Sequence, residues 1–209
     1  KLLGTWSLSK ENRVYVGYED LSPHLVHALV ATEDVRFEDH SGIDARAFMR
    51  AVIKRGIFMQ KHAGGGSTIT QQLAKQFYSP TADNVMERLL QKPIEWVIAV
   101  KLERYYTKEE ILTMYLNKFD FLNNAVGIKT AAKTYFGKDP KNLKIEEAAT
   151  LVGMCKNPSL YNPRRFNERS RGRRNTVLDQ MRKAGFLTQE ECCLLYTSPS
   201  PRDGLLSRM

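Results

Sequence analysis

Apolar residues recur three and four positions apart along most of this chain, which is the period of amphipathic helices. One such stripe runs through residues 22–33, behind a Ser22-Pro23 pair that is typical of a helix start. A second stripe follows Asp44, which we expect to cap a helix. The apolar side chains of this second helix are expected to face a core: Phe48, Met49, Val52 and Ile53.

The same period continues further along the chain and predicts a mainly α protein. It is found in segments 67–78, 84–105, 107–117, 127–136, 145–154 and 167–184. Pro93 is expected to kink or restart the long second segment, and Thr107 with Glu110 forms a capping box before the third. Gly137 is placed to stop the fourth. Residues 13–18 alternate instead and predict one short strand.

The pattern changes near the end of the chain. In 192–209 the helical period gives way to Ser/Pro turns, so we expect this tail to be non-native or disordered and assign 1–191 to the domain. No apolar run approaches the roughly 20 residues that span a bilayer. Because the chain begins mid-sequence at Lys1, we interpret it as a fragment that has lost an upstream membrane anchor.

The charge balance indicates an anionic partner. The net charge is +9, which suits nucleic acid, a phosphorylated substrate or a lipid surface. Nucleic acid is not expected, because the basic stretches lack interleaved aromatic residues and match no nucleic-acid-binding pattern. The three cysteines fit no zinc spacing, so we expect them to be structural or incidental.

The stretch "HAGGGSTITQQLAKQFY", residues 62–78, is the first candidate for chemistry. At 100° per residue Thr68, Gln72 and Lys75 share one stripe with Gln71 beside it. A separate apolar stripe is formed by Ile69, Leu73 and Phe77. Glycines before a helix let its free N–H groups approach a ligand, so the segment predicts an anion cradle, with phosphate as the expected anion. The alternative is a flexible loop before an ordinary amphipathic helix.

Two acidic clusters are the other candidates. Glu33 ends an apolar helix, with Phe37 four residues later, and a carboxylate near apolar residues suits a general base or acid. Lys92 and Glu95 share a helix face. Two acids flanking a sugar carbon are typical of glycosyl chemistry. The alternatives are a solvated helix end for the first cluster and a surface ion pair worth at most about 1 kcal/mol for the second.

These three stretches occur together and in order, and the combination resembles the family 51 glycosyltransferases. That family comprises the peptidoglycan glycosyltransferase domain of class A penicillin-binding proteins and the monofunctional transglycosylases. The matching motifs are "EDVRFEDHSG" (33–42), "GGSTITQQLAK" (65–75), "KPIEWVIAVKLE" (92–103), "EEILTMYLN" (109–117), "GIKTAAKTYFGK" (127–138) and "EAATLVGMCKNPSLYNP" (147–163).

The resemblance implies a lysozyme-like, bilobed helical fold with a large lobe and a small membrane-facing jaw at about 44–62. It implies transfer of a growing lipid-linked glycan to the 4-hydroxyl of incoming lipid II, with inversion. Catalytic roles fall on Glu33 as base and on Glu95, which would orient lysines or hold a divalent cation, Mg²⁺ or Mn²⁺, at the pyrophosphate. Substrate-binding roles fall on Asp34, Phe37, His40, Ser67, Thr68, Gln71, Gln72, Lys75, Lys92, Asn117, Lys156 and Tyr161.

The expected surroundings follow from the same resemblance. The jaw alternates basic residues with apolar ones, which suits a membrane surface, although a core helix with a basic face is the alternative. Its apolar residues are Phe48, Met49, Ile53, Ile57, Phe58 and Met59. We expect a location on the outer, periplasmic face of the bacterial cytoplasmic membrane, and a C-terminal transpeptidase domain outside this chain is a candidate partner. The rival activity is a lysozyme-like hydrolase, which would have no pyrophosphate for the lysines to hold.

Overall fold

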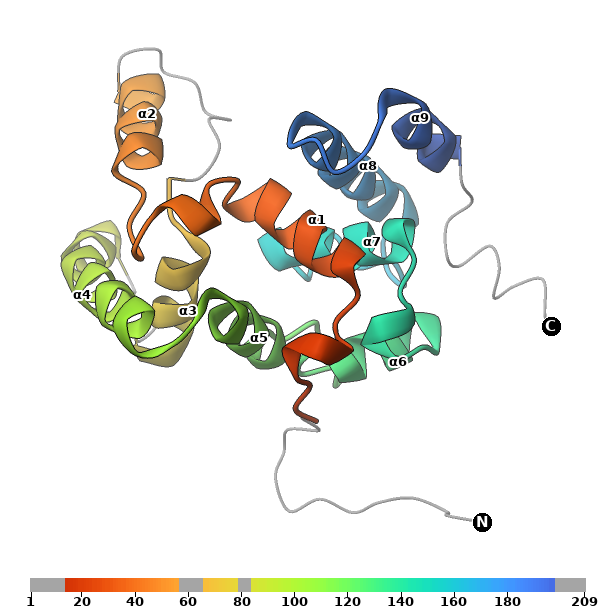
Figure 1. The fold of residues 1–209 in the computed structure, drawn as a ribbon, viewed down its shortest axis with the longest axis horizontal. Coiled ribbons are helices and arrows are strands. Elements are labelled where there is room, and N and C mark those ends of the chain that lie inside the picture. Colours follow the sequence, from red (N-terminus) through yellow and green to blue (C-terminus); the bar gives the residue numbers. More distant parts are fainter. Residues whose placement is uncertain (1–13, 57–65, 79–83, 198–209) are drawn as a thin grey trace. The chain divides into compact units, whose positions relative to one another are not determined.

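The computed structural model describes residues 14–56, 66–78 and 84–197, and these are almost entirely helical (Figure 1). Within them an isolated bridge pairs Asp120 with Val126 and no strand forms. The mainly α prediction is confirmed. The helices are α1 (Pro23–Glu33), α2 (Ala45–Gly56), α3 (Ile69–Tyr78), α4 (Val85–Tyr105), α5 (Lys108–Lys118), α6 (Ile128–Phe136), α7 (Ile145–Lys156), α8 (Asn167–Lys183) and α9 (Gln189–Thr197), with 3-10 turns η1 (Tyr18–Asp20), η2 (Phe37–Asp39) and η3 (Pro140–Asn142).

Local signals set most of the helix ends. The Asp44 carboxylate accepts the Ala47 N–H at 2.9 Å and caps α2 as expected. Before α5, the Thr107 hydroxyl oxygen accepts the Glu110 N–H at 3.2 Å while the Glu110 carboxylate accepts the Thr107 N–H at 2.7 Å. Gly137 ends α6 in the left-handed region, with φ of 68°. No helix in the described ranges is both long and apolar enough to cross a bilayer.

Two predictions about regular structure need correction. Pro93 lies inside α4, which continues through it, so the predicted restart is wrong, while a kink stays a prediction. The packing of α3 along α4 supports the helix there, and a proline removes only its own N–H from the ladder. Residues 14–17 form no strand, and Tyr18 begins η1. The backbone of Val16 instead pairs with a side-chain amide, that of Asn117.

The expectation that α2 turns its apolar residues inward is also wrong. Phe48, Met49 and Ile53 are 39%, 55% and 41% exposed. Phe48 touches α4 edge-on through the Trp96 ring, with centroids 5.4 Å apart. The other jaw residues named above lie outside the described residues (Ile57, Phe58 and Met59), and so does the side chain of Val52.

The chain divides into two compact units, Val30–Tyr115 and the remainder, Lys1–Leu29 with Leu116–Met209. In the first unit α3 and α4 lie side by side (Figure 1), and Ile69, Leu73 and Ala99 are fully buried. In the second unit α7 packs on α8. The core there includes Ala148, Ala149, Leu151, Val152, Val177 and Leu178. The lysozyme-like, bilobed detail and the domain limits stay predictions.

The tail does not lose its helical period at residue 192. Cys192 is 1% exposed within α9, which continues to Thr197 and packs on α8. The buried Arg174 of α8 donates a hydrogen bond to the Tyr196 carbonyl at 3.4 Å, so α9 is anchored by both apolar and polar contacts. Residues 198–209 lie outside the described part, and the origin of 192–209 stays a prediction.

Candidate active site

Glu33 is the last residue of α1 and is half-buried. Its Oε2 accepts a hydrogen bond from Nε2 of Gln72 on α3, at 2.9 Å. Gln72 Oε1 in turn accepts the hydroxyl of the buried Tyr115, at 3.1 Å. A carboxylate can only accept, so Gln72 turns its NH2 group toward Glu33 and leaves its carbonyl oxygen for the Tyr115 hydroxyl. The predicted acid is therefore held in a defined orientation against the predicted glutamine.

Asp34 ties the loop after α1 to the start of α3. Its Oδ2 accepts the Ile69 N–H at 3.1 Å and lies 2.9 Å from His40 Nε2. The Gly42 N–H donates to His40 Nδ1 at 3.2 Å, so Nε2 carries the proton that is donated to Asp34. Asp34 and His40 are buried, with side chains 5% and 8% exposed, and Phe37 is fully buried. These three predicted substrate-binding residues are buried in contacts within the loop that follows Glu33, and they hold that loop in shape.

The first turn of α3 caps itself. The Gln71 N–H donates to Thr68 Oγ1 at 3.1 Å and Gln71 Oε1 accepts the Thr68 N–H at 3.3 Å, which is a capping box. The Thr68 hydroxyl donates to the Gly42 carbonyl at 2.7 Å. The expectation of free N–H groups at this helix start is therefore wrong for Thr68, Ile69 and Gln71. The Thr-x-x-Gln spacing in "TITQ" is the signal that would have predicted the box.

Lys92 and Glu95 form the predicted pair, with Nζ 2.8 Å from Oε2. The Glu95 side chain is 4% exposed and that of Lys92 is 36% exposed. Because its carboxylate is buried, the pair is not the fully exposed surface ion pair of the alternative interpretation. Lys92 Nζ also donates to Ser67 Oγ at 3.3 Å. Lys75 is exposed three residues after Gln72 and shares its helix face. Glu33 and Lys92 thus both contact the segment 67–75, and Glu95 is linked to it through Lys92.

Arg36 and Asp44 form an ion pair that holds the other end of the same loop. Burial alone would raise the pKa of Asp44, but the hydrogen bond from the Ala47 N–H and the Arg36 guanidinium hold that pKa below its ordinary value of 3.8. A carboxyl with a depressed folded pKa adds stability above its unfolded pKa. That stability is lost as the pH falls through the folded pKa.

We expect Asp44→Asn to lower the free energy of unfolding by about 1 kcal/mol at pH 7, since Asn keeps the cap but loses the charge. The gap to wild type should close as the pH falls from 3.8, the ordinary pKa of an aspartate, through the lower pKa of the folded Asp44. Urea unfolding at pH 7, 5 and 3 measures this. A gap that stays constant across the series would contradict the assignment of the effect to the Asp44 charge.

The sequence of the chain matches a known protein family. Residues 1–182 match the model of the protein family described as Transglycosylase. The chain belongs to the transglycosylase family. Relatives agree: the chain is 42% identical over 185 residues to penicillin-binding protein 2a of Streptococcus pneumoniae, covering 88% of this chain and 24% of that protein.

Relatives from two other species give the same result. Penicillin-binding protein 1A of Aquifex aeolicus is 40% identical over 194 residues, covering 91% of this chain and 25% of the relative. Penicillin-binding protein 1A of Escherichia coli is 39% identical over 184 residues, covering 87% and 21%. This transglycosylase chain thus spans about a quarter of the length of these relatives.

A solved structure supports the fold of the transglycosylase chain. The crystal structure of penicillin-binding protein 1A from Haemophilus influenzae superposes with a TM-score of 0.52 at 22% identity, covering 91% of this chain and 18% of that one. At this identity the likeness supports the helical architecture alone.

Three predicted substrate-binding residues belong to the other unit, Lys1–Leu29 with Leu116–Met209. Lys156 and Tyr161 line an open pocket of about 490 Å³ there, where the Arg173 guanidinium lies over the Tyr161 ring at 5.9 Å. Asn117 is buried instead, and its amide accepts the Val16 N–H at 3.0 Å and donates to the Val16 carbonyl at 2.9 Å. The described geometry gives Asn117 a structural role, and its substrate contact stays a prediction.

Asn117→Ala is accordingly expected to destabilise the transglycosylase fold by about 2–4 kcal/mol, because it removes two hydrogen bonds and leaves two buried backbone groups unpaired. Thermal unfolding measures the loss. Asn142→Ala, at an exposed asparagine of η3, is the control and should change stability by no more than about 0.5 kcal/mol. Full stability of Asn117→Ala with weakened substrate binding would restore the substrate-binding interpretation.

The sequence patterns assign no individual role to some neighbours of the site. Thr70, Glu103 and Lys108 form polar contacts behind the loop 34–42, although they come from three different helices. The divalent cation stays a prediction as well. In the described ranges, no group of three or more histidine, cysteine, aspartate or glutamate side chains is placed to hold a metal ion.

Proposed function

We propose that this chain is a peptidoglycan glycosyltransferase domain that polymerises lipid II into glycan strands. Membership of the transglycosylase family supports this, as do the relatives named penicillin-binding proteins. The observation that carries the proposal is the orientation of Glu33, half-buried and hydrogen-bonded to Gln72 at 2.9 Å. An acid held this way beside a cationic segment suits transfer of a sugar from a pyrophosphate.

Glu33 acts as the general base in this proposal. Its carboxylate takes the proton from the 4-hydroxyl of the incoming lipid II sugar. The hydroxyl oxygen attacks the anomeric carbon of the growing chain, and the bond from that carbon to the lipid pyrophosphate breaks, which inverts the carbon. A positioned base contributes roughly 10²- to 10⁴-fold to such a rate.

The leaving pyrophosphate needs positive charge more than a proton, because it is already a stable anion. The N–H groups of Thr68, Ile69 and Gln71 are engaged within the protein, so the ammonium groups carry this role. Lys75 and Lys92 are the candidates beside Glu33. The exposed Lys156 is the further candidate that the resemblance supplies.

Glu95 holds Lys92 in place, and its carboxylate lowers the cost of placing an ammonium group in a partly buried site. The resemblance also assigns Glu95 to a Mg²⁺ or Mn²⁺ ion. The Glu95 carboxylate is hydrogen-bonded to Lys92, and an ion at the pyrophosphate would take its other ligands from the substrate phosphates, so the ion stays a prediction. The transfer above is written without one.

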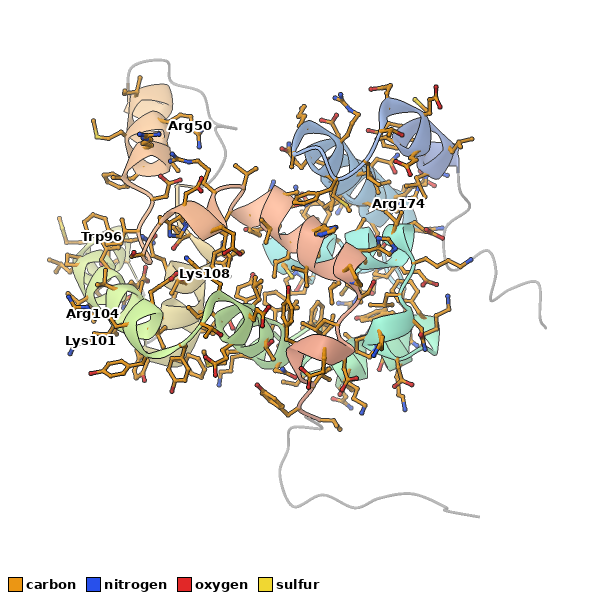
Figure 2. The ribbon with its side chains drawn as sticks, viewed as in Figure 1. Arg50, Trp96, Lys101, Arg104, Lys108 and Arg174 are labelled. Atoms are coloured by element: carbon orange, nitrogen blue, oxygen red, sulfur yellow. The ribbon has the colours of Figure 1, made fainter. Side chains whose placement is uncertain are left out.

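A membrane surface is the proposed environment. Exposed apolar residues follow one face of α4 at spacings of four, four and three: Met86, Leu90, Ile94 and Val97. Exposed basic residues are present on α4 and on α2. Figure 2 shows Lys101 and Arg104 on α4 and Arg50 on α2. Apolar side chains with nearby cations suit an anionic lipid surface. The outer face of the cytoplasmic membrane is the corresponding location.

Binding to anionic vesicles tests this environment. We expect the Leu90→Glu/Ile94→Glu double variant to bind phosphatidylglycerol vesicles about tenfold or more weakly, because it removes two apolar side chains and adds two negative charges. Leu194→Glu, at an exposed leucine of α9, is the control and should bind as wild type does. Equal binding by both variants would count against a membrane-facing α4.

Incubation with labelled lipid II tests the activity itself. Glycan products of increasing length, separated with and without a divalent ion, are the expected result. Release of sugars from finished glycan, with no product from lipid II, would overturn the proposal in favour of a lysozyme-like hydrolase. The upstream anchor and the transpeptidase domain stay predictions.

A further inference from the structure

Lys108 begins α5 and points back toward the loop that follows α1 (Figure 2). Its Nζ donates to the His40 carbonyl at 2.6 Å and lies 2.8 Å from Glu103 Oε2. It also lies 4.4 Å from the centroid of the buried Phe37 ring, which is within cation–π range. The carbonyl oxygen, the carboxylate and the ring face all attract a cation. A side chain with three such partners is fixed in direction, unlike an ordinary surface lysine.

Glu103 extends this contact to α3. Its second oxygen, Oε1, accepts the Thr70 hydroxyl at 2.6 Å. The Glu103 side chain is only 5% exposed and Thr70 is fully buried. A buried carboxylate with one cation and one hydroxyl partner is held more firmly than an exposed ion pair. Lys108 and Glu103 therefore connect the loop after α1 to the first turn of α3.

A second connection joins the same loop to the same turn. His40 donates to Asp34, and Asp34 accepts the N–H of Ile69, which is the neighbour of Thr70. The two connections meet at His40, which donates to Asp34 from its ring and accepts Lys108 at its carbonyl. They close a ring of polar contacts around the loop 34–42, which begins directly after Glu33.

We propose that Lys108 is a positioning residue for the transfer reaction, setting the orientation of Glu33 through the His40 carbonyl and the loop 34–42. The inference rests on the proposed function, because it concerns the same carboxylate. Lys108 touches neither the substrate nor the reacting atoms. Its effect comes from holding the loop against α3, where Gln72 orients Glu33 one turn beyond Ile69 and Thr70. Small displacements of a base lower the rate steeply.

The test uses a double variant, Lys108→Met/Glu103→Gln, with the full chain and labelled lipid II in detergent. Replacing Lys108 alone would leave the Glu103 carboxylate buried and unpaired, whereas the amide introduced by Glu103→Gln is neutral and still accepts the Thr70 hydroxyl. We expect kcat to fall 10- to 100-fold with KM changed less than threefold. Lys108→Arg keeps a cation in reach of Glu103 and the His40 carbonyl. Its kcat should be at least tenfold higher than that of the double variant.

A matched control is present in the other unit. Lys138 pairs with Glu147 at 2.8 Å, and this pair is also partly buried, so Lys138→Met/Glu147→Gln removes an equivalent ion pair. It should match the first double variant in melting temperature and keep wild-type kcat. Equal loss of kcat in both double variants would show a general stability effect and overturn the inference.

The histidine ring gives a readout that is independent of activity. Nitrogen-15 chemical shifts of His40 should report the Nε2–H tautomer in wild type and a mixture of tautomers in Lys108→Met/Glu103→Gln. If Lys108→Met/Glu103→Gln kept the Nε2–H tautomer and the wild-type kcat, the inference about Lys108 would be overturned, while the proposed function would stand. Absence of any polymerisation by the wild-type chain would overturn the proposed function, and with it the catalytic consequence assigned to Lys108.

Discussion

Glu33→Gln is expected to lower the maximal rate of lipid II polymerisation by roughly 10²- to 10⁴-fold, the contribution of a positioned general base. The substitution keeps the size of the side chain and an oxygen that can accept the Gln72 amide, so the contact at 2.9 Å should survive. What disappears is the ability to take a proton from the acceptor hydroxyl. Initial rates at saturating lipid II, with unfolding midpoints measured in parallel, give the result.

The control for this prediction is Glu38→Gln. Glu38 is an exposed acid of η2, in the loop that follows Glu33. Glu38→Gln removes one negative charge, as Glu33→Gln does, but leaves the contact between Glu33 and Gln72 in place. It should leave the rate within about twofold, since an exposed substitution of this kind has little effect. If Glu33→Gln polymerised lipid II at a rate close to that of Glu38→Gln, another group would have to be the base.

The helices could be predicted from the sequence because their signals are short-range. The capping box of Thr107 and Glu110 and the left-handed Gly137 act within four residues, and the structure confirms both. The capping box of Thr68 and Gln71 is equally local, but the glycines before it suggest an open anion site. The same pattern of donors and acceptors can be used internally or offered to a ligand, and only the structure shows which.

The spacing of apolar residues along a helix does not by itself decide which face of the helix is exposed to water. The apolar residues of α2 keep a helical spacing, yet Met49 is 55% exposed. A membrane-facing stripe and a core-facing stripe have the same spacing, since both need one apolar side. The sequence therefore predicts the helix and its cap, but not its environment.

The contacts of Lys108 could not be predicted from the sequence either, because they join residues that are far apart along the chain. Lys108 and His40 are 68 positions apart in sequence, and Glu103 meets Thr70 across 33. No periodicity connects residues at such distances. The motif resemblance supplies Glu33, Gln72 and Lys92, because it compares whole segments in order, but it gives no reason to choose the residues that hold those segments together.

Gly42 is where the loop after η2 rests on α4. Its φ is 93°, a value that side chains rarely adopt, and a Cβ added there would lie 2.8 Å from the backbone carbon and oxygen of Ala99. Backbone atoms in the middle of a packed helix cannot move aside easily. The same residue accepts the Thr68 hydroxyl and donates its N–H to His40, so any displacement of Gly42 reaches both.

Gly42→Ala should therefore lower the free energy of unfolding by about 2–4 kcal/mol, combining left-handed strain with steric overlap. In a chain of this size that corresponds to a fall in melting temperature of roughly 6–12 °C. Gly137→Ala separates the two causes, because φ there is also positive but no atom lies within 4 Å of an added Cβ, so a loss of about 1 kcal/mol is expected. Gly172→Ala, in open space inside α8, should stabilise by up to about 1 kcal/mol. If Gly42→Ala lost no more stability than Gly137→Ala, the loop would not be clamped on α4, and the close approach that keeps Glu33 beside α3 would have to come from elsewhere.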